Sequence, residues 1–335
     1  MTVTATVRDE RHSAGWAGPD PTFSVIVSTH GRAGYLAGML DALERQSHGD
    51  FEAVVADNGS PDDTWDTLLA RCETTPLRLR ALRLDPHDGP AVPRNTAVER
   101  SRGRWLAFTD DDCLPAAQWL TALQAAAGAD VTVVQGRTDA DPQGWGGPWG
   151  RTLRVSGVSG LYETANLACP RPAFDAAGGF PAERLLSGRA FGEDVLLGAR
   201  LARAGRVVAA PDALVHHRVL PGSYRQFLSE RRRLEGFPAL VRQVPELRSA
   251  FTAGVFLSRR TAIADAGVAA LGVAAALQQP LFALGAAPWA AQCWSAARQR
   301  PGRHRLVRSA QLGLGDLVAM VALVRGSARA RRLVL

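Results

Sequence analysis

The feature that most constrains this chain is an apolar run that ends in three consecutive carboxylates. Residues 105–109 have the apolar composition of a buried strand, and Asp110, Asp111 and Asp112 follow directly. In open α/β sheets, ligands bind at the carboxyl ends of the strands, and like charges placed there repel each other unless a cation lies between them. The run therefore predicts a cation site on an α/β sheet, and the alternative is a solvated acidic turn.

The rest of the first two thirds alternates strand and helix patterns, which predicts a mostly parallel, Rossmann-like sheet with flanking helices. Pro115 is expected to open a helix that runs to Ala127. Apolar or β-rich runs predict strands at 23–29, 51–57, 77–84, 105–109, 131–135, 161–169, 207–210 and 211–217.

Polar side chains mark two further positions in this pattern. Asp57 ends the second strand, where it is placed to accept hydrogen bonds from a nucleobase or a ribose; the alternative is a helix cap or an Asx-turn. Arg94 follows a segment rich in Gly and Pro at a helix start, and its charge suits a phosphate.

A second acidic centre, Glu193 and Asp194, follows Gly192 in the first turn of a predicted helix. The helix dipole favours acids there, so capping is one interpretation. The same dipole keeps a carboxylate ionised and able to accept a proton, which is the other. His216 and His217 end the last predicted strand, and they are candidates either for structural hydrogen bonds or for metal contact.

Residues 137–159 are rich in Gly and lack periodicity, which predicts a long loop. Trp145 and Trp149 in this loop offer a stacking surface for an acceptor, or they pack beneath the loop.

The charge of +7 comes with no lysine, so all 39 basic residues are arginines. Arginine favours bidentate contacts with phosphate and carboxylate, which suits a nucleotide or an anionic lipid. No nucleic-acid-binding signature is present, and nucleic acid is not an expected partner. Residues 1–21 are polar, contain no apolar signal-peptide core and are predicted to form a flexible arm, so the catalytic part is expected in the cytoplasm.

The last third has membrane-like features. Residues 224–234 combine arginines with aromatic residues, as a basic amphipathic helix at a membrane surface does, although an ordinary surface helix fits as well. Residues 266–297 contain no charged residue and are flanked on both sides by arginines. We expect a hairpin of short helices that enters or lies on the inner face of the cell membrane; the alternative is a soluble appendage or an interface of a homo-oligomer. A further apolar helix is predicted at 312–324, interrupted by Asp316.

Six motifs in series resemble those of the family 2 glycosyltransferases, which have the GT-A fold. The resemblance covers residues 22–220 and rests on Val25–Arg32, Asp57–Ser60, Arg94–Asn95, Asp110–Asp112, Gly178–Phe180 and Gly192–Asp194. The resemblance implies a GT-A domain at 22–220. With the polar arm and the apolar last third, the chain is expected to have three parts: a flexible arm at 1–21, this domain, and a helical membrane-associated region at 221–335.

The resemblance implies a nucleotide-diphosphate sugar donor (a UDP-, GDP- or dTDP-sugar), a divalent Mn²⁺ or Mg²⁺ ion, and inversion at the anomeric carbon. It implies the following roles: donor binding by Thr29, His30, Arg32, Asp57, Arg94, Asp110 and Asp111; metal binding by Asp112 and His217; and general base catalysis by Asp194, with Glu193 second. The acceptor is expected to be a hydroxyl, on a lipid-linked carrier or a cell-envelope glycan, near Trp145 and Trp149.

Two departures from the family pattern matter. Gly31 stands where many relatives have Asn, which removes a side-chain contact. The QxxRW signature of processive synthases is absent, so transfer of a single sugar is expected. The alternatives are a nucleotidyltransferase, which needs a Gly-rich loop with Arg and Lys after the first strand, and a binding module without turnover, which needs no intact acidic centres.

Overall fold

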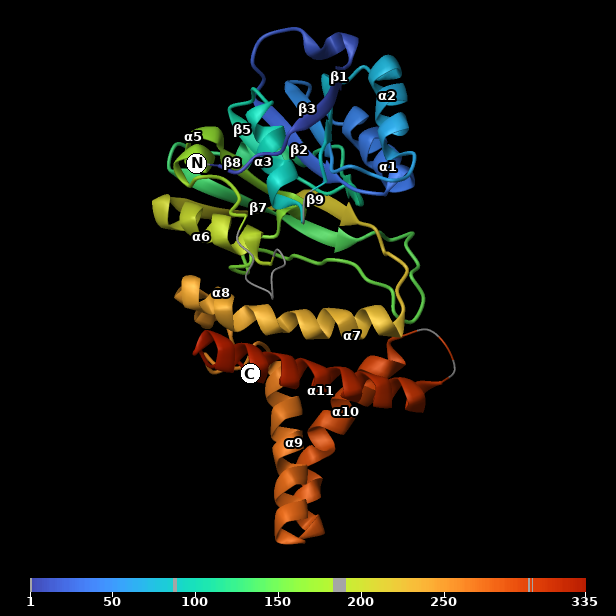
Figure 1. The fold of residues 1–335 in the computed structure, drawn as a ribbon, viewed down its shortest axis with the longest axis vertical. Coiled ribbons are helices and arrows are strands. Elements are labelled where there is room, and N and C mark those ends of the chain that lie inside the picture. Colours follow the sequence, from blue (N-terminus) through green and yellow to red (C-terminus); the bar gives the residue numbers. More distant parts are fainter. Residues whose placement is uncertain (1, 87–88, 183–190, 301, 303) are drawn as a thin grey trace. The chain divides into compact units, whose positions relative to one another are not determined.

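The computed structural model describes residues 2–86, 89–182, 191–300, 302 and 304–335. These divide into two compact units, which are described separately (Figure 1). The first unit takes in the described residues of 1–144, 152–184 and 188–218. The second takes in those of 145–151, 185–187 and 219–335, so the segment with both loop tryptophans belongs with the C-terminal helices.

The first unit is built on a mixed sheet. Within the described residues nine strands pair in the order β1-β4-β3-β2-β5-β8-β7-β9-β6. The central strands β4, β3, β2 and β5 are parallel, β7 and β9 are parallel, and β1, β8 and β6 run antiparallel to their neighbours. The bounds are β1 Val7–His12, β2 Phe23–Thr29, β3 Phe51–Asp57, β4 Leu79–Leu84, β5 Trp105–Phe108, β6 Cys113–Pro115, β7 Val131–Ala140, β8 Leu167–Pro170 and β9 Arg206–His217.

Helices cover both faces of this sheet, which is why its central strands are apolar at nearly every position. One face packs against α1 Ala33–Glu44, α2 Thr64–Thr74 and α4 Trp119–Ala126. The other packs against α3 Ala91–Glu99, α5 Arg171–Ala176 and α6 Glu193–Ala204. Two short 3₁₀ turns, η1 Ala14–Trp16 and η2 Thr164–Asn166, complete the unit. The predicted α/β fold with flanking helices is confirmed.

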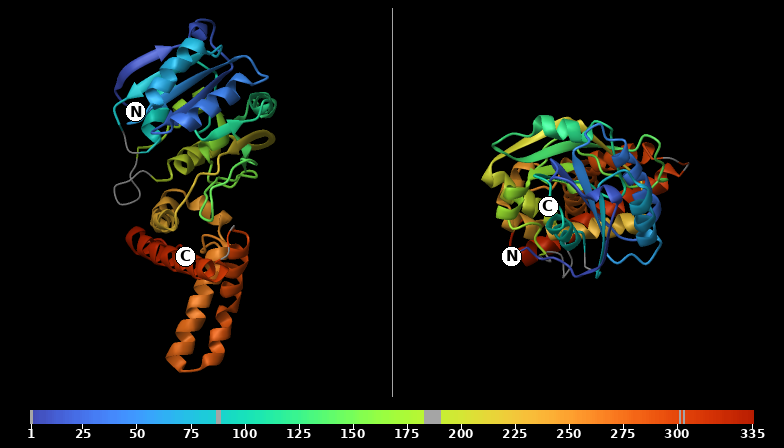
Figure 2. Two further views of the ribbon diagram at one scale, coloured as in Figure 1. Left: turned by 90° about the vertical axis from the view of Figure 1, so that its right-hand side faces the viewer. Right: turned by 90° about the horizontal axis from the view of Figure 1, so that it is seen from above.

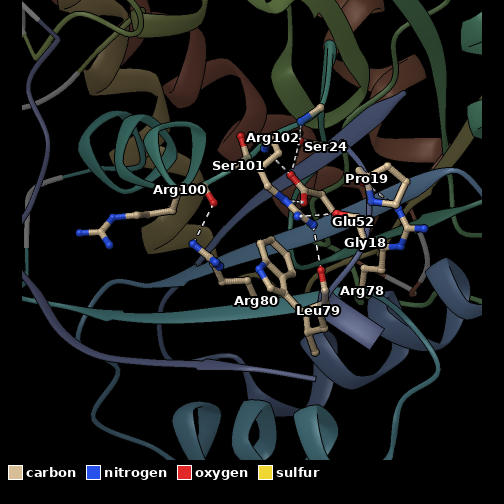
Figure 3. A network of polar contacts seen from close by, with 12 residues as sticks. Gly18, Pro19, Ser24, Glu52, Arg78, Leu79, Arg80, Arg100, Ser101 and Arg102 are labelled. Carbon is tan, nitrogen blue, oxygen red and sulfur yellow. Dashed lines mark hydrogen bonds and ion pairs between the residues drawn. The ribbon is translucent and has the colours of Figure 1, made fainter. Parts of the chain in front are cut away.

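A buried ion pair joins the start of β3 to the loop before β5 (Figure 3). Glu52 is fully buried, and its carboxylate accepts hydrogen bonds from the Ser24 hydroxyl at 2.7 Å and from the Arg102 guanidinium at 3.1 Å. Arg102 in turn donates to the carbonyl oxygens of Trp16 and Gly18 and lies over the Trp16 ring. This network fixes the N-terminal segment against the sheet.

The expected flexible arm is therefore wrong for much of its length. Residues 7–12 form β1, which pairs antiparallel with β4 along the edge of the sheet. Its sequence, VRDERH, is polar because an edge strand needs few apolar side chains, so periodicity gave no signal.

Four other expectations about elements need correction. Pro115 ends β6 instead of opening a helix, because residues 113–115 pair with β9, and the helix begins at Trp119. The predicted strand 161–169 contains η2 and only becomes β8 at Leu167. The runs 207–210 and 211–217 form one strand, β9, with a register shift opposite Gly136 and Arg137. Correspondingly, β7 extends to Ala140, into the segment predicted as loop.

The second unit is helical. The basic segment forms α7 Tyr224–Arg233, followed by η3 Leu234–Gly236, α8 Phe237–Gln243 and η4 Pro245–Ala250. The charge-free segment forms α9 Arg259–Leu277, η5 Pro280–Ala286 and α10 Ala287–Arg298, and the chain ends in α11 Arg305–Ala330. Helix α11 lies beside α7, and α9 and α10 form a hairpin (Figures 1 and 2).

Asp316 does not interrupt α11, which is longer than the predicted 312–324. Its carboxylate is buried and accepts two hydrogen bonds from Arg260 of α9, at 2.8 and 2.9 Å, and one from the Trp289 indole of α10, at 3.0 Å. The acid therefore joins three helices at the base of the hairpin.

Candidate active site

The candidate site lies in the first unit, where the parallel strands end. Thr29 at the end of β2 is directly opposite Asp57 at the end of β3, and β5 leads into the three acids. Because carboxyl ends of neighbouring parallel strands share one edge of the sheet, the fold brings together residues that are far apart in the sequence.

The three acids differ in burial. The side chains of Asp111 and Asp112 are 5% and 4% exposed, whereas that of Asp110 is 28% exposed. Arg32 donates to both buried acids, to Asp111 Oδ1 at 2.9 Å and to Asp112 Oδ2 at 2.6 Å, and the Thr29 hydroxyl donates to Asp111 Oδ2 at 2.6 Å. Desolvation nevertheless raises the pKa of Asp111 to about 6 and raises the pKa of Asp112 as well.

Arg94 connects the two acidic centres. Its side chain is buried, and its Nη2 donates to Asp110 Oδ1 at 2.6 Å while its Nη1 lies 3.3 Å from Asp194 Oδ1. The guanidinium also lies over the Phe180 ring, at 5.5 Å from the centroid. One planar side chain thus holds the acid after β5 and the acid at the start of α6 in a single cluster.

Asp194 is held on its other oxygen by a residue that sequence reasoning missed. The backbone N–H and the hydroxyl of Thr164 donate to Asp194 Oδ2, at 3.2 and 2.8 Å. Burial raises the pKa of Asp194 to about 6, although Arg94 and Thr164 oppose the shift. Glu193 makes no hydrogen bond or ion pair with the described residues.

The sequence pattern does not single out Thr164, because it predicts one continuous strand at 161–169. The polar group Glu163, Thr164 and Asn166 interrupts that apolar run, and this interruption is the signal that marks η2. Asn166 is buried as well; its amide donates to the carbonyl oxygens of Arg137 and Ala213 and accepts from the Trp119 indole. The turn that presents Thr164 is therefore rigidly fixed.

Two atoms face each other as ligands of a cation do. Asp112 Oδ1 is buried and has no hydrogen-bond partner among the described residues. His217 Nε2 lies 3.5 Å from it. His217 Nδ1 contacts the carbonyl oxygen of Arg218 at 2.8 Å. Because a carbonyl only accepts, this contact places a hydrogen on Nδ1, and in the neutral ring it leaves the lone pair on Nε2. The donor set fits a divalent metal ion.

Cys113 lies within 4.8 Å of the same atoms. It is fully buried in the core, and burial together with the neighbouring carboxylates raises the pKa of its thiol well above the usual value. Cys113 therefore packs as a core residue beside these atoms.

The remaining nucleotide-binding candidates have separate environments. Asp57 is fully buried, and its Oδ1 accepts from the backbone N–H and the hydroxyl of Ser60, as in an Asx-turn. Its Oδ2 has no hydrogen-bond partner among the described residues and remains available to a base N–H. His30 is exposed, and its Nδ1 lies 3.1 Å from the carbonyl oxygen of Asn58.

The two tryptophans of the long loop belong to the second unit. Trp149 packs against Tyr224 and Phe227 of α7, and Arg300 lies over its ring. Trp145 is 76% exposed. Trp149 therefore contributes to packing, whereas the acceptor role stays a prediction for both.

Comparison with known proteins agrees with this geometry. Residues 24–182 match the model of the glycosyl transferase family 2. Glycosyltransferase AglE of Haloferax volcanii is 34% identical over 122 residues, which are 36% of this chain and 40% of that protein. A PGL/p-HBAD biosynthesis glycosyltransferase of Mycobacterium tuberculosis is 36% identical over 106 residues, which are 31% of this chain and 41% of that protein. The chain thus matches about two fifths of the length of these relatives.

Two solved structures share the fold over nearly the whole chain. The mannosyltransferase PcManGT from Pyrobaculum calidifontis, in complex with GDP-Man and Mn²⁺, has a TM-score of 0.58 at 19% identity, covering 92% of this chain and 87% of that one. Residues 1–349 of TarS from S. aureus, in complex with UDP-GlcNAc, have a TM-score of 0.51 at 16% identity, covering 93% and 92%. Residues 24–182 of this chain are thus similar in sequence to the glycosyl transferase family 2, and the chain shares the fold of these two structures.

Proposed function

We propose that the protein is an inverting glycosyltransferase that moves a single sugar from a nucleotide-diphosphate sugar to an acceptor hydroxyl. The observation that carries the proposal is the contact of Arg94 with both Asp110 and Asp194. It places a carboxylate that can accept a proton beside the acids that suit a nucleotide diphosphate. The alternative interpretations are a solvated turn for Asp110–Asp112 and helix capping for Asp194. Neither requires one arginine to contact both acids.

For the donor, a UDP-, GDP- or dTDP-sugar, we assign the residues at the ends of β2, β3 and β5. Thr29 and Asp57 hold the base end, with Asp57 Oδ2 as the acceptor for a base N–H. Asp110 is the most exposed of the three acids and suits a ribose hydroxyl. The other assigned donor contacts are His30, Arg32, Arg94 and Asp111. The two neighbours named above bind GDP-Man and UDP-GlcNAc, which supports the donor class.

Asp112 and His217 would hold a Mn²⁺ or Mg²⁺ ion. When bound, such an ion offsets the negative charge that develops on the departing diphosphate. The structure supports this assignment through the free lone pair on His217 Nε2 and the unpartnered Asp112 Oδ1.

Asp194 is assigned as the general base. It removes the proton of the acceptor hydroxyl, whose oxygen bonds to the anomeric carbon as that carbon's bond to the diphosphate oxygen breaks. Attack opposite the departing diphosphate inverts the configuration. Arg94 and Thr164 orient the carboxylate, since each holds one of its oxygens. Glu193 is the second candidate, because it lies next in sequence and makes no hydrogen bond or ion pair with the described residues.

We assign the acceptor to the class of lipid-linked or cell-envelope glycans, with exposed Trp145 as a stacking surface. Transfer of one sugar is supported by the surroundings of Gln226, whose side chain accepts from the Ser223 backbone N–H as part of the capping box of α7. That amide starts a helix, so it does not serve as the glutamine of a processive motif.

The test combines binding and turnover. Asp112→Asn should abolish the thermal stabilisation that Mn²⁺ and a sugar nucleotide give together, while the protein without ligand keeps its melting temperature. Asp194→Asn should keep donor binding and lose transfer. Full transfer by Asp112→Asn, or an unchanged rate for Asp194→Asn, would contradict the respective assignment.

The reaction products separate the proposal from its alternatives. A panel of UDP-, GDP- and dTDP-sugars is incubated with the protein and Mn²⁺, and the products are identified by mass spectrometry. A glycosyltransferase releases the nucleoside diphosphate. Release of pyrophosphate would indicate a nucleotidyltransferase, and binding without any product for every donor and acceptor would indicate a binding module.

A further inference from the structure

The hairpin of the second unit has two arms of similar length. Helix α9 has 19 residues, Arg259–Leu277, and η5 with α10 returns over Pro280–Arg298. Gln278 and Gln279 form the connection, and no charged residue occurs at 266–297. Nothing in the packing of a soluble domain requires so long a charge-free stretch.

Large apolar side chains of this hairpin are exposed. Only 17% of the most apolar 18-residue stretch of α9 is buried within the described structure. The exposed residues include Leu271, Leu277, Leu281, Phe282 and Leu284, with Leu281 exposed to 73%. Exposing such a surface to water is unfavourable. Soluble proteins expose apolar residues singly, whereas here they follow one another along the hairpin.

The charged residues of the hairpin lie towards its base, and Asp265 is the charged residue farthest along either arm. Arg259 and Arg260 begin one arm and Arg298 ends the other, so positive charge gathers at the base. Gln278 and Gln279 are exposed at the apex, where they are polar but uncharged. This order, charged then apolar then polar, is the order of a membrane from the cytoplasmic headgroups through hydrocarbon to the opposite headgroups.

The length of the two arms also fits a lipid bilayer. At about 1.5 Å per residue, the whole of α9 spans about 28 Å, close to the roughly 30 Å hydrocarbon thickness of a bilayer, with its charged residues Arg259, Arg260 and Asp265 in the part nearest the base. An arm that entered only one leaflet would leave the amides and backbone of the apex in hydrocarbon, where they have no partners. The glutamines fit better at the far headgroups.

The two arms pack as membrane helices do. The Trp289 side chain lies against Gly267, so that a Cβ there would come within 2.9 Å of it, and Ala270 lies equally close to Gly285. Small residues permit this approach, which gives the packing contacts that hold helices together in lipid. At the base, Asp316 accepts hydrogen bonds from both Arg260 and Trp289, so these two donors have an acceptor there.

A second apolar surface of the same unit suits a lipid headgroup region. A cavity of about 370 Å³ is lined by Leu314, Leu317, Val318 and Val321 of α11. Arg232 and Arg325 also line it, together with one acid, Glu235. Apolar walls beside two arginines match an acyl chain beneath an anionic phosphate.

We propose that residues 259–298 cross a lipid bilayer twice, with the glutamine apex at the far face. Two crossings keep residues 1–258 and 299–335 on one side, and the arginines at the base assign that side to the cytoplasm. The partner of the exposed hairpin is thus the bilayer, and not a second copy of the chain. The inference is independent of the chemistry assigned to the first unit.

Impermeant maleimide labelling of full-chain variants that each carry one introduced cysteine tests the crossing. The native cysteines 72, 113, 169 and 293 are buried and provide a silent background. Gln279→Cys reports the apex, and Gly49→Cys, where a Cβ meets nothing within 4 Å, reports the first unit. In spheroplasts of a bacterial host Gln279→Cys should be labelled and Gly49→Cys should not; in inverted membrane vesicles the pattern should reverse.

Each other labelling pattern overturns the proposal. Labelling of both positions from the same side means that the hairpin lies on the surface, and protection of Gln279→Cys from both sides means that it enters one leaflet only. Recovery of the wild-type chain in the soluble fraction as a dimer would identify the hairpin as a protein interface.

A charge-insertion pair provides a second measurement. In carbonate-washed membranes, the double variant Leu271→Arg with Leu284→Arg should be lost from the pellet, because arginine is costly within hydrocarbon. Val158→Arg is the matched control, since Val158 is an exposed apolar residue of the first unit, and it should remain in the pellet. Retention of the double variant would contradict insertion. Both variants are checked by circular dichroism for helix content.

Discussion

At the scale of single residues, Asp194 titrates within the working pH range of an enzyme. Burial raises its pKa to about 6, so the carboxyl is protonated below that pH and cannot accept a proton from an acceptor. We expect kcat to be constant above about pH 7 and to fall about tenfold per pH unit below 6. This fall is the acidic limb of the pH profile. Glu193→Gln should keep transfer but move the fall in kcat to lower pH, because the Glu193 carboxylate helps to raise the pKa of Asp194. Loss of transfer at every pH in that variant would move the base role to Glu193.

Thr164 sets the position of that acidic limb. Its hydroxyl donates to the charged form of Asp194 and so lowers the pKa of the carboxyl. A hydrogen bond of about 1 kcal/mol corresponds to about 0.7 pKa units, so Thr164→Val should move the acidic limb to higher pH by that amount. Thr164→Ser keeps the hydroxyl and should restore the profile. A Val variant with an unmoved limb would show that the contact is only structural.

The site residues found from the sequence share one property: each follows directly on a strongly patterned element. Thr29 and Asp57 end apolar strands, Asp110 follows one, and Asp194 lies in the first turn of a helix, so local patterns predict where in the fold these candidates lie. Thr164 lies in a 3₁₀ turn without a pattern of its own. The bridging role of Arg94 depends on a contact across 100 residues, which no local pattern reveals.

At the scale of elements, the predicted parallel core follows from continuous apolar runs, which only strands buried on both faces require. The edges of the sheet were harder to predict. Strand β1 is polar, and β6 has three residues whose conformation is imposed by pairing with β9. Long-range pairing also joins the two halves of β9, where Pro211 and Asp212 locally indicate a turn.

The buried Glu52 provides a stability prediction at this scale. Glu52→Ala removes the only carboxylate paired with Arg102 among the described residues and opens the network around Trp16 and Ser24. Removing one partner of a buried ion pair should lower the free energy of unfolding by about 3–5 kcal/mol. Urea denaturation followed by tryptophan fluorescence measures it. Glu73→Ala, at an exposed helix position, should stay within about 0.5 kcal/mol of wild type.

At the scale of the whole molecule, the C-terminal helices depend on a single acid. Asp316→Ala leaves Arg260 and the Trp289 indole without their acceptor and should lower the unfolding free energy in detergent by about 3 kcal/mol. Asp265→Asn is the control, because Asp265 Oδ2 has no hydrogen-bond partner among the described residues. Equal effects of the two variants would show that burial, and not the shared contact, stabilises the base.

The Arg94 and Arg32 contacts have a kinetic consequence. Both guanidinium groups are already neutralised by Asp110, Asp111, Asp112 and Asp194, so four carboxylates face only two arginines. A nucleotide diphosphate that enters without a cation is repelled by the net negative charge of these carboxylates. For the proposed reaction we therefore expect the cation to bind before the nucleotide or together with it.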